Sequence, residues 1–305
     1  MQKTVVALGT FDGVHLGHRA LLARAADLAH ANGDEAVAFT FSNHPRELFG
    51  DSFDALCTLR RKESLIQSVG VDAVDAVPFT ASFAAQSPEA FVAWLCDRYP
   101  AGIAAVVCGY DYRFGAHAAG DAATLKKLGA RHGFSVEVLD AVLYGDAPCS
   151  SSRVRQALQM GDLDAANAML ARPYAIEGRV EHHRAIGRTL GFPTANITHD
   201  GQLLPRDGVY ASALLLDGKL YASVTNVGCN PTVGGTERTV ETHVMDASLE
   251  LYEREVAVLL LKPLREERRF DSRKALAVQI QLDAEAAKKV FQDSEKSVYN
   301  TVNVW

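Results

Sequence analysis

The chain changes its pattern of strands and helices near Arg172-Pro173, and this change limits its fold more than any other feature. Before it, short β-branched runs such as Thr4–Leu8 alternate with amphipathic stretches such as Leu16–Asn32. Strand, helix and strand in turn favour a parallel sheet covered on both faces. We therefore expect an α/β domain over residues 1–173, with two short helices near 151–170 at its end.

After the change, strand-like segments are separated by turn signals such as Asp217-Gly218 and Gly234-Gly235. This pattern predicts a compact antiparallel β-barrel over residues 176–305, with the domain boundary near 172–177. The final segment, Ser272–Phe291, is amphipathic, and Asp271 or Ser272 is its expected N-cap. The predicted strands are Ala175–Val180, Gly208–Leu216, Lys219–Val227, Arg238–Asp246 and Glu255–Leu261.

Composition excludes several classes of protein. Of the 305 residues, 48% are hydrophobic and 22% are charged, which is ordinary for a chain with a real core. The net charge is −6 and neither half is basic, so we expect no nucleic-acid partner. No apolar run approaches the ~18–20 residues that span a bilayer, so we expect no membrane association. Five cysteines without a C-x-x-C pattern indicate reduced thiols and a cytoplasmic protein.

The first candidate site follows the first predicted strand, where residues 9–18 read G-T-F-D-G-V-H-L-G-H. His15 and His18 are three residues apart, so they share a face at the start of a helix. The helix N-terminus attracts anions, and Gly13 and Gly17 allow a ligand to approach the backbone. Two imidazoles there can donate hydrogen bonds to phosphate oxygens during phosphoryl transfer. A lone histidine at this place would more simply be a solvated helix-start residue.

The second candidate site is the P-T-A-N segment inside G-R-T-L-G-F-P-T-A-N-I, residues 187–197. In an extended chain Thr194 and Asn196 point the same way. A hydroxyl and an amide oxygen are hard ligands that suit Mg²⁺ carrying nucleotide phosphates. Gly187 and Gly191 would let the preceding loop wrap those phosphates. Taken alone, P-T-A-N reads equally well as a turn that enters a strand.

The H-x-G-H element resembles the nucleotidyltransferase superfamily, and the longer F-D-G-V-H-L-G-H resembles the N-terminal module of bacterial bifunctional riboflavin kinase/FAD synthetase. Three further segments resemble that family's motifs in the same order. By themselves, His44-Pro45 would also read as a turn, residues 109–115 as a loop with an Asp111–Arg113 ion pair, and residues 149–155 as a helix cap with surface arginines. The segments are Phe41–Arg46, with Asn43 in place of the usual proline, Gly109–Gly115, with Tyr112 for phenylalanine, and Cys149–Arg155, with Ser152 for threonine.

The second half resembles the riboflavin kinase of the same family. Its motifs occur in order, and the family's catalytic glutamate corresponds to Glu241. One loop departs from the family, because His183 replaces a glycine and Ile186 replaces a basic residue. These departures predict an active kinase with altered nucleotide affinity or flavin dependence. Besides P-T-A-N, the matching segments are Leu204-Pro205, Gly208–Tyr210, Asn226–Thr232, Val240–Asp246 and Leu251-Tyr252.

The resemblance implies a Rossmann-like nucleotidyltransferase domain, then a riboflavin kinase-type barrel with a C-terminal helix. It implies phosphorylation of riboflavin by ATP to FMN and ADP, and adenylylation of FMN by ATP to FAD and diphosphate, both with Mg²⁺. It further implies catalytic roles for Glu241, His15, His18 and Arg155; ATP or phosphate binding by Gly9, Phe11, Asp12, Gly17, Asp111, Arg113, Ser150, Ser151, Ser152, Arg153, Gly187, Arg188 and Gly191; flavin binding by His44, Pro45, Arg46 and Arg265; and metal binding by Thr194 and Asn196.

Two alternatives remain open at this level. The first domain could transfer a nucleotide to another phosphorylated metabolite, or the whole chain could be a non-catalytic flavin-binding sensor. The P-T-A-N barrel argues against the first alternative, and the intact His15, His18, Thr194, Asn196 and Glu241 argue against the second. Expected partners are the small-molecule substrates and flavin-dependent apoproteins, and the sequence leaves the oligomeric state open.

Overall fold

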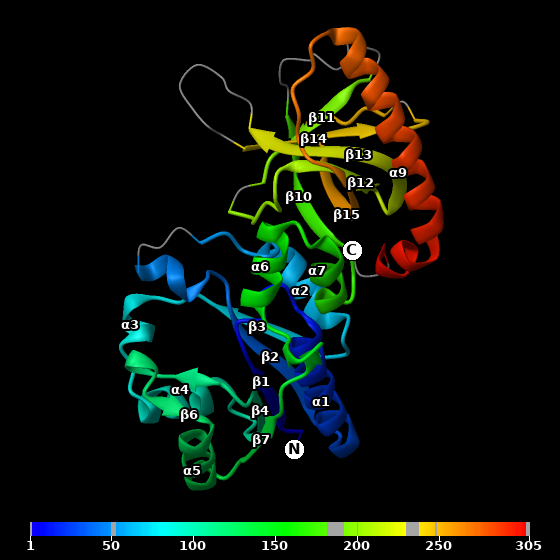
Figure 1. Ribbon diagram of the computed structural model, residues 1–305. Coiled ribbons are helices and arrows are strands. Elements are labelled where there is room, and N and C mark those ends of the chain that lie inside the picture. The colour runs from blue at the N-terminus through cyan, green and yellow to red at the C-terminus, as the bar shows by residue number, and fades with distance from the viewer. Residues whose placement is uncertain are drawn as a thin grey trace. The chain divides into compact units, whose positions relative to one another are not determined.

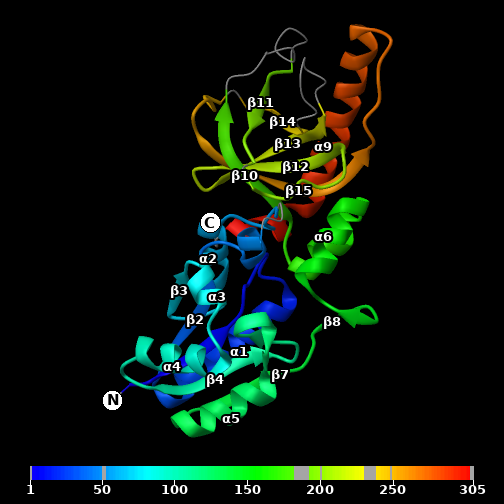
Figure 2. The ribbon, with the colours of Figure 1, turned by 90° about the vertical axis from the view of Figure 1, so that its left-hand side faces the viewer.

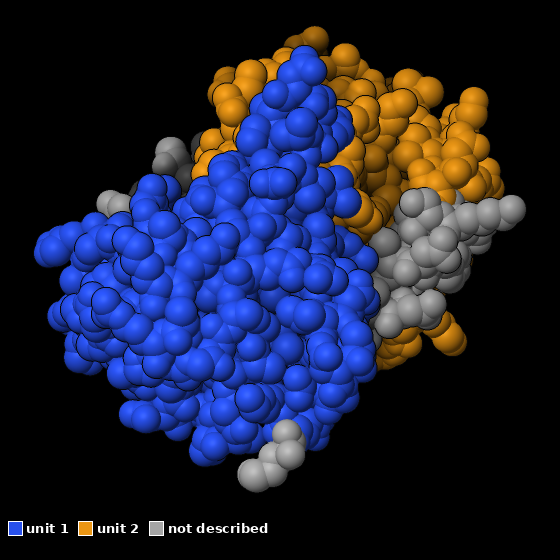
Figure 3. Space-filling view, turned by 90° about the horizontal axis from the view of Figure 1, so that it is seen from below, with its two compact units in different colours: residues 1–55, 59–150 blue, residues 56–58, 151–305 orange. Residues whose placement is uncertain are grey.

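The computed structural model describes residues 2–49, 53–181, 192–199, 201–229, 238–247 and 249–302, without the side chains of 49 and 295–302. Within these ranges the chain forms two compact units, shown in blue and orange in Figure 3. The first unit comprises residues 1–55 and 59–150, and the second comprises 56–58 and 151–305.

The first unit is built on a five-stranded parallel sheet with strand order β3-β2-β1-β4-β7 (Figure 1). Strand β1 lies at the centre, and all five of its residues are buried. The strand order reverses between β1 and β4, and in open α/β sheets ligands bind beside the carboxyl ends of the strands at such a reversal. The strands are β1 Thr4–Leu8, β2 Glu35–Phe41, β3 Ala73–Val77, β4 Ile103–Gly109 and β7 Ser135–Leu139.

Helices cover both faces of this sheet, as predicted. Val6 and Leu8 of β1 pack with α4 and α5 in the main core cluster, whereas α1 packs on β1, β2 and β4 from the other face (Figures 1 and 2). The helices are α1 Leu16–Asn32, α2 Leu59–Gln67, α3 Ala81–Ala84, α4 Pro88–Arg98 and α5 Ala122–His132, with 3₁₀ turns η1 Pro45–Phe49 and η2 Ala116–Ala118 and short strands β5 Arg113–Phe114, β6 Gly120–Asp121, β8 Leu143–Tyr144 and β9 Ala147–Pro148.

The second unit contains the predicted antiparallel barrel, closed in the order β10-β11-β14-β13-β12-β15. All nine residues of β12 are buried, because one face lines the barrel interior and helix α9 packs outside (Figure 1). The strands are β10 Tyr174–Glu181, β11 Thr194–Ile197, β12 Gly208–Leu216, β13 Lys219–Cys229, β14 Arg238–Val244 and β15 Glu255–Arg265, and the C-terminal helix is α9 Arg273–Val302.

Two helices, α6 Ser151–Met160 and α7 Leu163–Leu170, group with the barrel. The expectation that they complete the first unit therefore differs from the observed grouping. The side chain of Asn167 donates to the carbonyl oxygen of Leu260 at 3.1 Å and accepts from the amide of Tyr174 at 2.7 Å. These bonds tie α7 to β15 and β10, so the compact units divide near residue 150.

A chain of four fully buried hydroxyl groups crosses the barrel interior. Ser212 bonds to Ser223 and to Thr225 at 2.8 Å, and Thr225 bonds to Thr242 at 2.9 Å. A buried hydroxyl without a partner costs roughly 1–3 kcal/mol, so this mutual pairing allows polar groups in the core. The bonds join β12, β13 and β14 and help to hold those strands in register.

Helix α9 is fastened to the barrel by a largely buried ion pair. The Arg265 guanidinium contacts the Asp283 carboxylate at 2.8 Å, and the two side chains are only 20% and 6% exposed. Asp283 lies at helical spacing among the predicted contact positions Leu276, Ile280, Ala287 and Phe291. That helix face is therefore not purely apolar, and Arg265, which the sequence predicts to bind flavin, also holds α9 against β15. The predicted N-cap is confirmed at Ser272, whose hydroxyl accepts from the amide of Ala275 at 3.1 Å.

We predict that Arg265→Met lowers the opening free energy of α9 by about 3–5 kcal/mol, because Asp283 is left buried without its cation. The control is Lys288→Met, which removes a half-exposed ion pair to Asp246 and should cost at most ~1 kcal/mol. Hydrogen exchange of the α9 and β15 amides in the full chain measures both changes. Equal effects of the two variants would contradict the prediction.

Candidate active sites

The loop that joins β1 to α1 has an unusual backbone. Phe11 has φ +51° and Val14 has φ +40°, a region that side chains with a Cβ seldom adopt. Both side chains are fully buried, and this burial holds the backbone in place. Gly9 must be a glycine, because a Cβ there would lie 2.8 Å from the Phe11 ring. Strained backbone of this kind is concentrated at functional sites.

The two histidines of this loop are brought together as predicted. The His15 and His18 rings stack with centroids 3.6 Å apart at 22°, and the Phe11 ring meets His18 edge-on at 5.3 Å. His15 is the N-cap of α1, since its Nδ1 accepts from the His18 amide at 3.4 Å. A Cβ at Gly17 would lie 3.1 Å from the His15 ring, so glycine allows this packing. Asp12, beside them, is 5% exposed.

The segment after β2 is held by Asn43, the residue that departs from the family's proline. Its side-chain oxygen accepts from the Phe79 amide at 2.7 Å, and its NH₂ donates to the Phe79 carbonyl oxygen at 3.2 Å. Proline could make neither bond. Asn43 therefore fastens the segment of the predicted flavin residues to the loop after β3. In that segment the His44 ring stacks on Phe53 at 3.5 Å, while Pro45 begins η1 and Arg46 is exposed.

The Gly109–Gly115 loop follows β4 at the same edge of the sheet. Arg113 forms its ion pair with Asp121, at 3.6 Å, and not with Asp111, so the alternative of an Asp111–Arg113 pair is wrong. Asp111 itself is exposed. Burial raises the pKa of the Tyr112 hydroxyl, whose ring stacks on that of Phe114. The loop therefore combines the exposed carboxylate of Asp111 with the packed aromatic rings of Tyr112 and Phe114.

The serine and arginine motif lies where the two units divide. Ser150 ends the first unit, and Ser151 begins α6 in the second, so Ser152, Arg153 and Arg155 lie in the first turns of a helix. The predicted start of a helix here is confirmed. The action of these residues on the same phosphates as His15 and His18 stays a prediction.

In the barrel, strand register brings the predicted kinase residues together. Ala195 and Ile197 are buried, whereas Thr194 and Asn196 lie on the outer, partly exposed face of β11, as predicted from their spacing. Asn196 is paired directly with Glu241 of β14, and Thr194 is paired with His243. Opposite residues of an antiparallel pair share a face. The proposed metal ligands and the proposed base therefore lie side by side.

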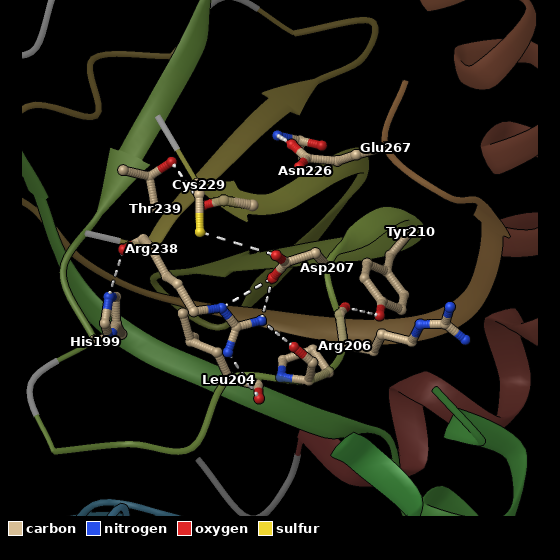
Figure 4. A network of polar contacts seen from close by, with 12 residues as sticks. His199, Leu204, Arg206, Asp207, Tyr210, Asn226, Cys229, Arg238, Thr239 and Glu267 are labelled. Carbon is tan, nitrogen blue, oxygen red and sulfur yellow. Dashed lines mark hydrogen bonds and ion pairs between the residues drawn. The ribbon is translucent and has the colours of Figure 1, made fainter. Parts of the chain in front are cut away.

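Two further polar residues on this face were not predicted from the sequence. Asn226 of β13 is paired with Glu241 on the side away from Asn196, and its NH₂ donates to the Glu267 carboxylate at 3.2 Å (Figure 4). That carboxylate lies over Gly228, where a Cβ would clash with it at 2.0 Å. Asn226 lies in the segment Asn226–Thr232, which resembles the family. Its position beside Glu241 follows only from the register of β13 with β14.

Strand β14 is anchored three residues before Glu241 by Arg238 (Figure 4). The Arg238 guanidinium donates to the Asp207 carboxylate, at 2.9 Å from Nε, and to the carbonyl oxygens of Leu204 and Pro205. These bonds fasten the start of β14 to the loop before β12. The Leu204-Pro205 segment therefore contributes backbone carbonyl groups that hold β14 in place. The predicted phosphate-loop residues Gly187, Arg188 and Gly191, with His183 and Ile186, lie outside the described residues.

Comparison with known proteins identifies the family of the chain. A family model described as FAD synthetase matches residues 1–153, and one described as riboflavin kinase matches residues 170–291. The bifunctional riboflavin kinase/FMN adenylyltransferase of Escherichia coli K12 is 38% identical over 94% of this chain and 92% of its own length. The chain belongs to this bifunctional family. Its Bacillus subtilis relative of the same name is 33% identical over 96% of this chain and 94% of its own.

The family fold is also represented among solved structures. A crystal structure named as a macrolide-efflux protein from Streptococcus pneumoniae has a TM-score of 0.85 and 30% identity, and the match covers 94% of each chain. In the family match, His15 and His18 fall in the FAD synthetase part, and Thr194, Asn196 and Glu241 fall in the riboflavin kinase part. Among the described helices, none is both long and apolar enough to cross a bilayer.

We predict that Asn43→Ala lowers the free energy of local opening at Phe79, in the loop after β3, by about 1–3 kcal/mol, because both bonds to the Phe79 backbone are lost. Asn43→Asp should weaken protection of the Phe79 amide less than Asn43→Ala, because its carboxylate still accepts from that amide and only the bond to the Phe79 carbonyl is lost. Hydrogen exchange at the Phe79 amide measures the effect. Asn32→Ala, which removes an exposed bond to the Leu28 carbonyl, is the control. An unchanged Phe79 amide in Asn43→Ala would refute the assignment.

Proposed function

We propose that this chain makes FMN and FAD in two successive reactions. The second unit transfers the γ-phosphate of ATP to riboflavin, giving FMN and ADP. The first unit then joins FMN to the AMP part of a second ATP, giving FAD and diphosphate. The observation that carries the proposal is that each part of the chain matches its own enzyme family and holds that family's polar residues in one place.

The kinase step follows from the arrangement around Glu241. The carboxylate accepts the proton of the ribityl 5′-hydroxyl as that oxygen attacks the γ-phosphorus and ADP leaves. Asn196 and Asn226, paired with Glu241 on either side, give this base polar neighbours. The base lies on a strand of a closed barrel, so it is fixed relative to its neighbours before substrate binds.

The donor set on β11 suits Mg²⁺. Thr194 and Asn196 offer a hydroxyl and an amide oxygen on one face, and both are hard ligands. No group of three or more His, Cys, Asp or Glu side chains forms a metal site among the described residues. Mg²⁺ in phosphate-transfer enzymes is usually bound by few protein groups together with the substrate phosphates. When bound, Mg²⁺ would neutralise phosphate charge.

The adenylylation step needs no nucleophile from the protein. A phosphate oxygen of FMN attacks the α-phosphorus of ATP, and diphosphate leaves. In this proposal His15 and His18, at the start of α1, donate to phosphate oxygens, and the helix N-terminus adds its partial positive charge. Gly9, Phe11, Asp12 and Gly17 shape this loop. In the same proposal Asp111, Arg113, Ser150–Ser152, Arg153 and Arg155 contact ATP, and His44, Pro45, Arg46 and Arg265 contact the flavin.

We further propose that the kinase domain begins near residue 176, that the protein acts in the cytoplasm, and that it passes its products to flavin-dependent apoproteins. The family model described as riboflavin kinase begins its match at residue 170, close to this start. The odd number of cysteines without a C-x-x-C pattern supports a reducing compartment.

We predict that each reaction can be removed separately. With riboflavin, ATP and Mg²⁺, His18→Ala should accumulate FMN, because adenylylation falls by about 10²-fold or more without this donor. Glu241→Ala should form neither product from riboflavin, since loss of a general base costs roughly 10²–10⁴-fold. Chromatographic separation of riboflavin, FMN and FAD over time measures both outcomes.

Two matched controls complete this experiment. Supplied with FMN, Glu241→Ala should still make FAD, because its first unit is intact. His30→Ala removes an exposed histidine from the other end of α1 and should behave as wild type. FAD formation from FMN by His18→Ala at the wild-type rate would refute the assigned role of the histidine.

A further inference from the structure

Lys62 reaches from helix α2 to the edge of the sheet where the first site lies. Its Nζ atom donates to the carbonyl oxygen of Phe41 at 2.6 Å and approaches the carbonyl oxygen of Thr10 at 3.5 Å. The side chain is partly buried. Nothing in the sequence distinguishes it, because a lysine in the run Leu-Arg-Arg-Lys looks like any solvated helix residue.

The two carbonyl groups belong to the two substrate loops. Thr10 lies in the loop of His15 and His18, and Phe41 is the last residue of β2, just before the predicted flavin segment. These strands are neighbours, so their carboxyl ends meet at one edge of the sheet. One ammonium group thus bridges the loop proposed for ATP and the segment proposed for FMN.

Other bonds make this bridge part of a continuous arrangement. The Thr10 carbonyl also accepts from the hydroxyl of the fully buried Thr40 at 2.9 Å. Beyond Phe41, the Ser42 amide donates to the Val77 carbonyl at 2.8 Å, and Asn43 holds Phe79. The end of β2 is therefore linked through Lys62 to the loop after β1, and the segment that follows β2 is held through Asn43 to the loop after β3. Charge-assisted hydrogen bonds are the strong ones in such a set.

We propose that Lys62 is a positioning residue for adenylyl transfer, whose ammonium group sets the spacing between the ATP loop and the FMN segment. The proposal rests on the function proposed above. Transfer requires the FMN phosphate oxygen to lie in line with the α-phosphorus of ATP. A misplacement of about 1 Å can cost roughly 10²-fold in rate. A lysine bridge that joins the two loops directly controls this distance.

The test uses the full chain with Lys62→Met, which keeps the length of the side chain and removes its donors. We expect kcat for FAD formation from FMN to fall about 10- to 100-fold, while the KM values for ATP and FMN change less than about threefold. Lys62→Arg should recover much of the rate, because a guanidinium can donate to both carbonyls. Arg60→Met removes an exposed cation from the same helix and should match wild type.

Riboflavin phosphorylation by the same variants serves as an internal control and should not change, because the kinase site belongs to the other unit. Wild-type kcat in Lys62→Met would overturn the proposal, as would equal losses in Lys62→Met and Arg60→Met. Parallel loss of kinase activity and of thermal stability in both Lys62 variants would also overturn it, since the residue would then serve the fold in general. If wild type itself makes no FAD from FMN, the proposed function fails, and that result is distinct from failure of the lysine's role.

Discussion

Backbone hydrogen bonding between neighbouring strands is the interaction on which both candidate sites depend. In the first unit, parallel pairing of β1 with β2 and β4 brings the carboxyl ends of these strands to one edge. The loops that follow the strands meet there, although they are far apart in the chain. In the second unit, antiparallel register sets Glu241 between Asn196 and Asn226. The side chains of both candidate sites are therefore positioned by the pairing of the strands.

Tight packing then refines what the strands place. Phe11 and Val14 adopt positive φ angles and are completely buried, and the stacked His15 and His18 need the space that Gly17 leaves. Such a loop does not rearrange freely, so the groups at the start of α1 are held in a fixed arrangement. Preorganised donors of this kind lower the barrier because they need no reorientation during the reaction.

The two proposed reactions share a physical logic. In each, an oxygen of the substrate itself attacks phosphorus, so the protein need supply only position, hydrogen bonds and, in the kinase, a base. This explains why a chain of net charge −6 can handle polyanionic substrates. Positive charge is needed only near the substrate phosphates. Helix ends, histidines, arginines and Lys62 supply it there, so the rest of the surface need not be basic.

Local pattern in the sequence was enough to predict the strand–helix alternation, the later barrel, the shared face of His15 and His18 and that of Thr194 and Asn196. Each depends on residues a few positions apart, whose relation follows from helical or strand periodicity. The tertiary structure alone decided the grouping of α6 and α7 with the barrel, the Asp283 carboxylate within the α9 contact face, and the positions of Glu267 and Lys62. Those depend on register and packing between segments distant in the chain, which periodicity within one segment does not encode.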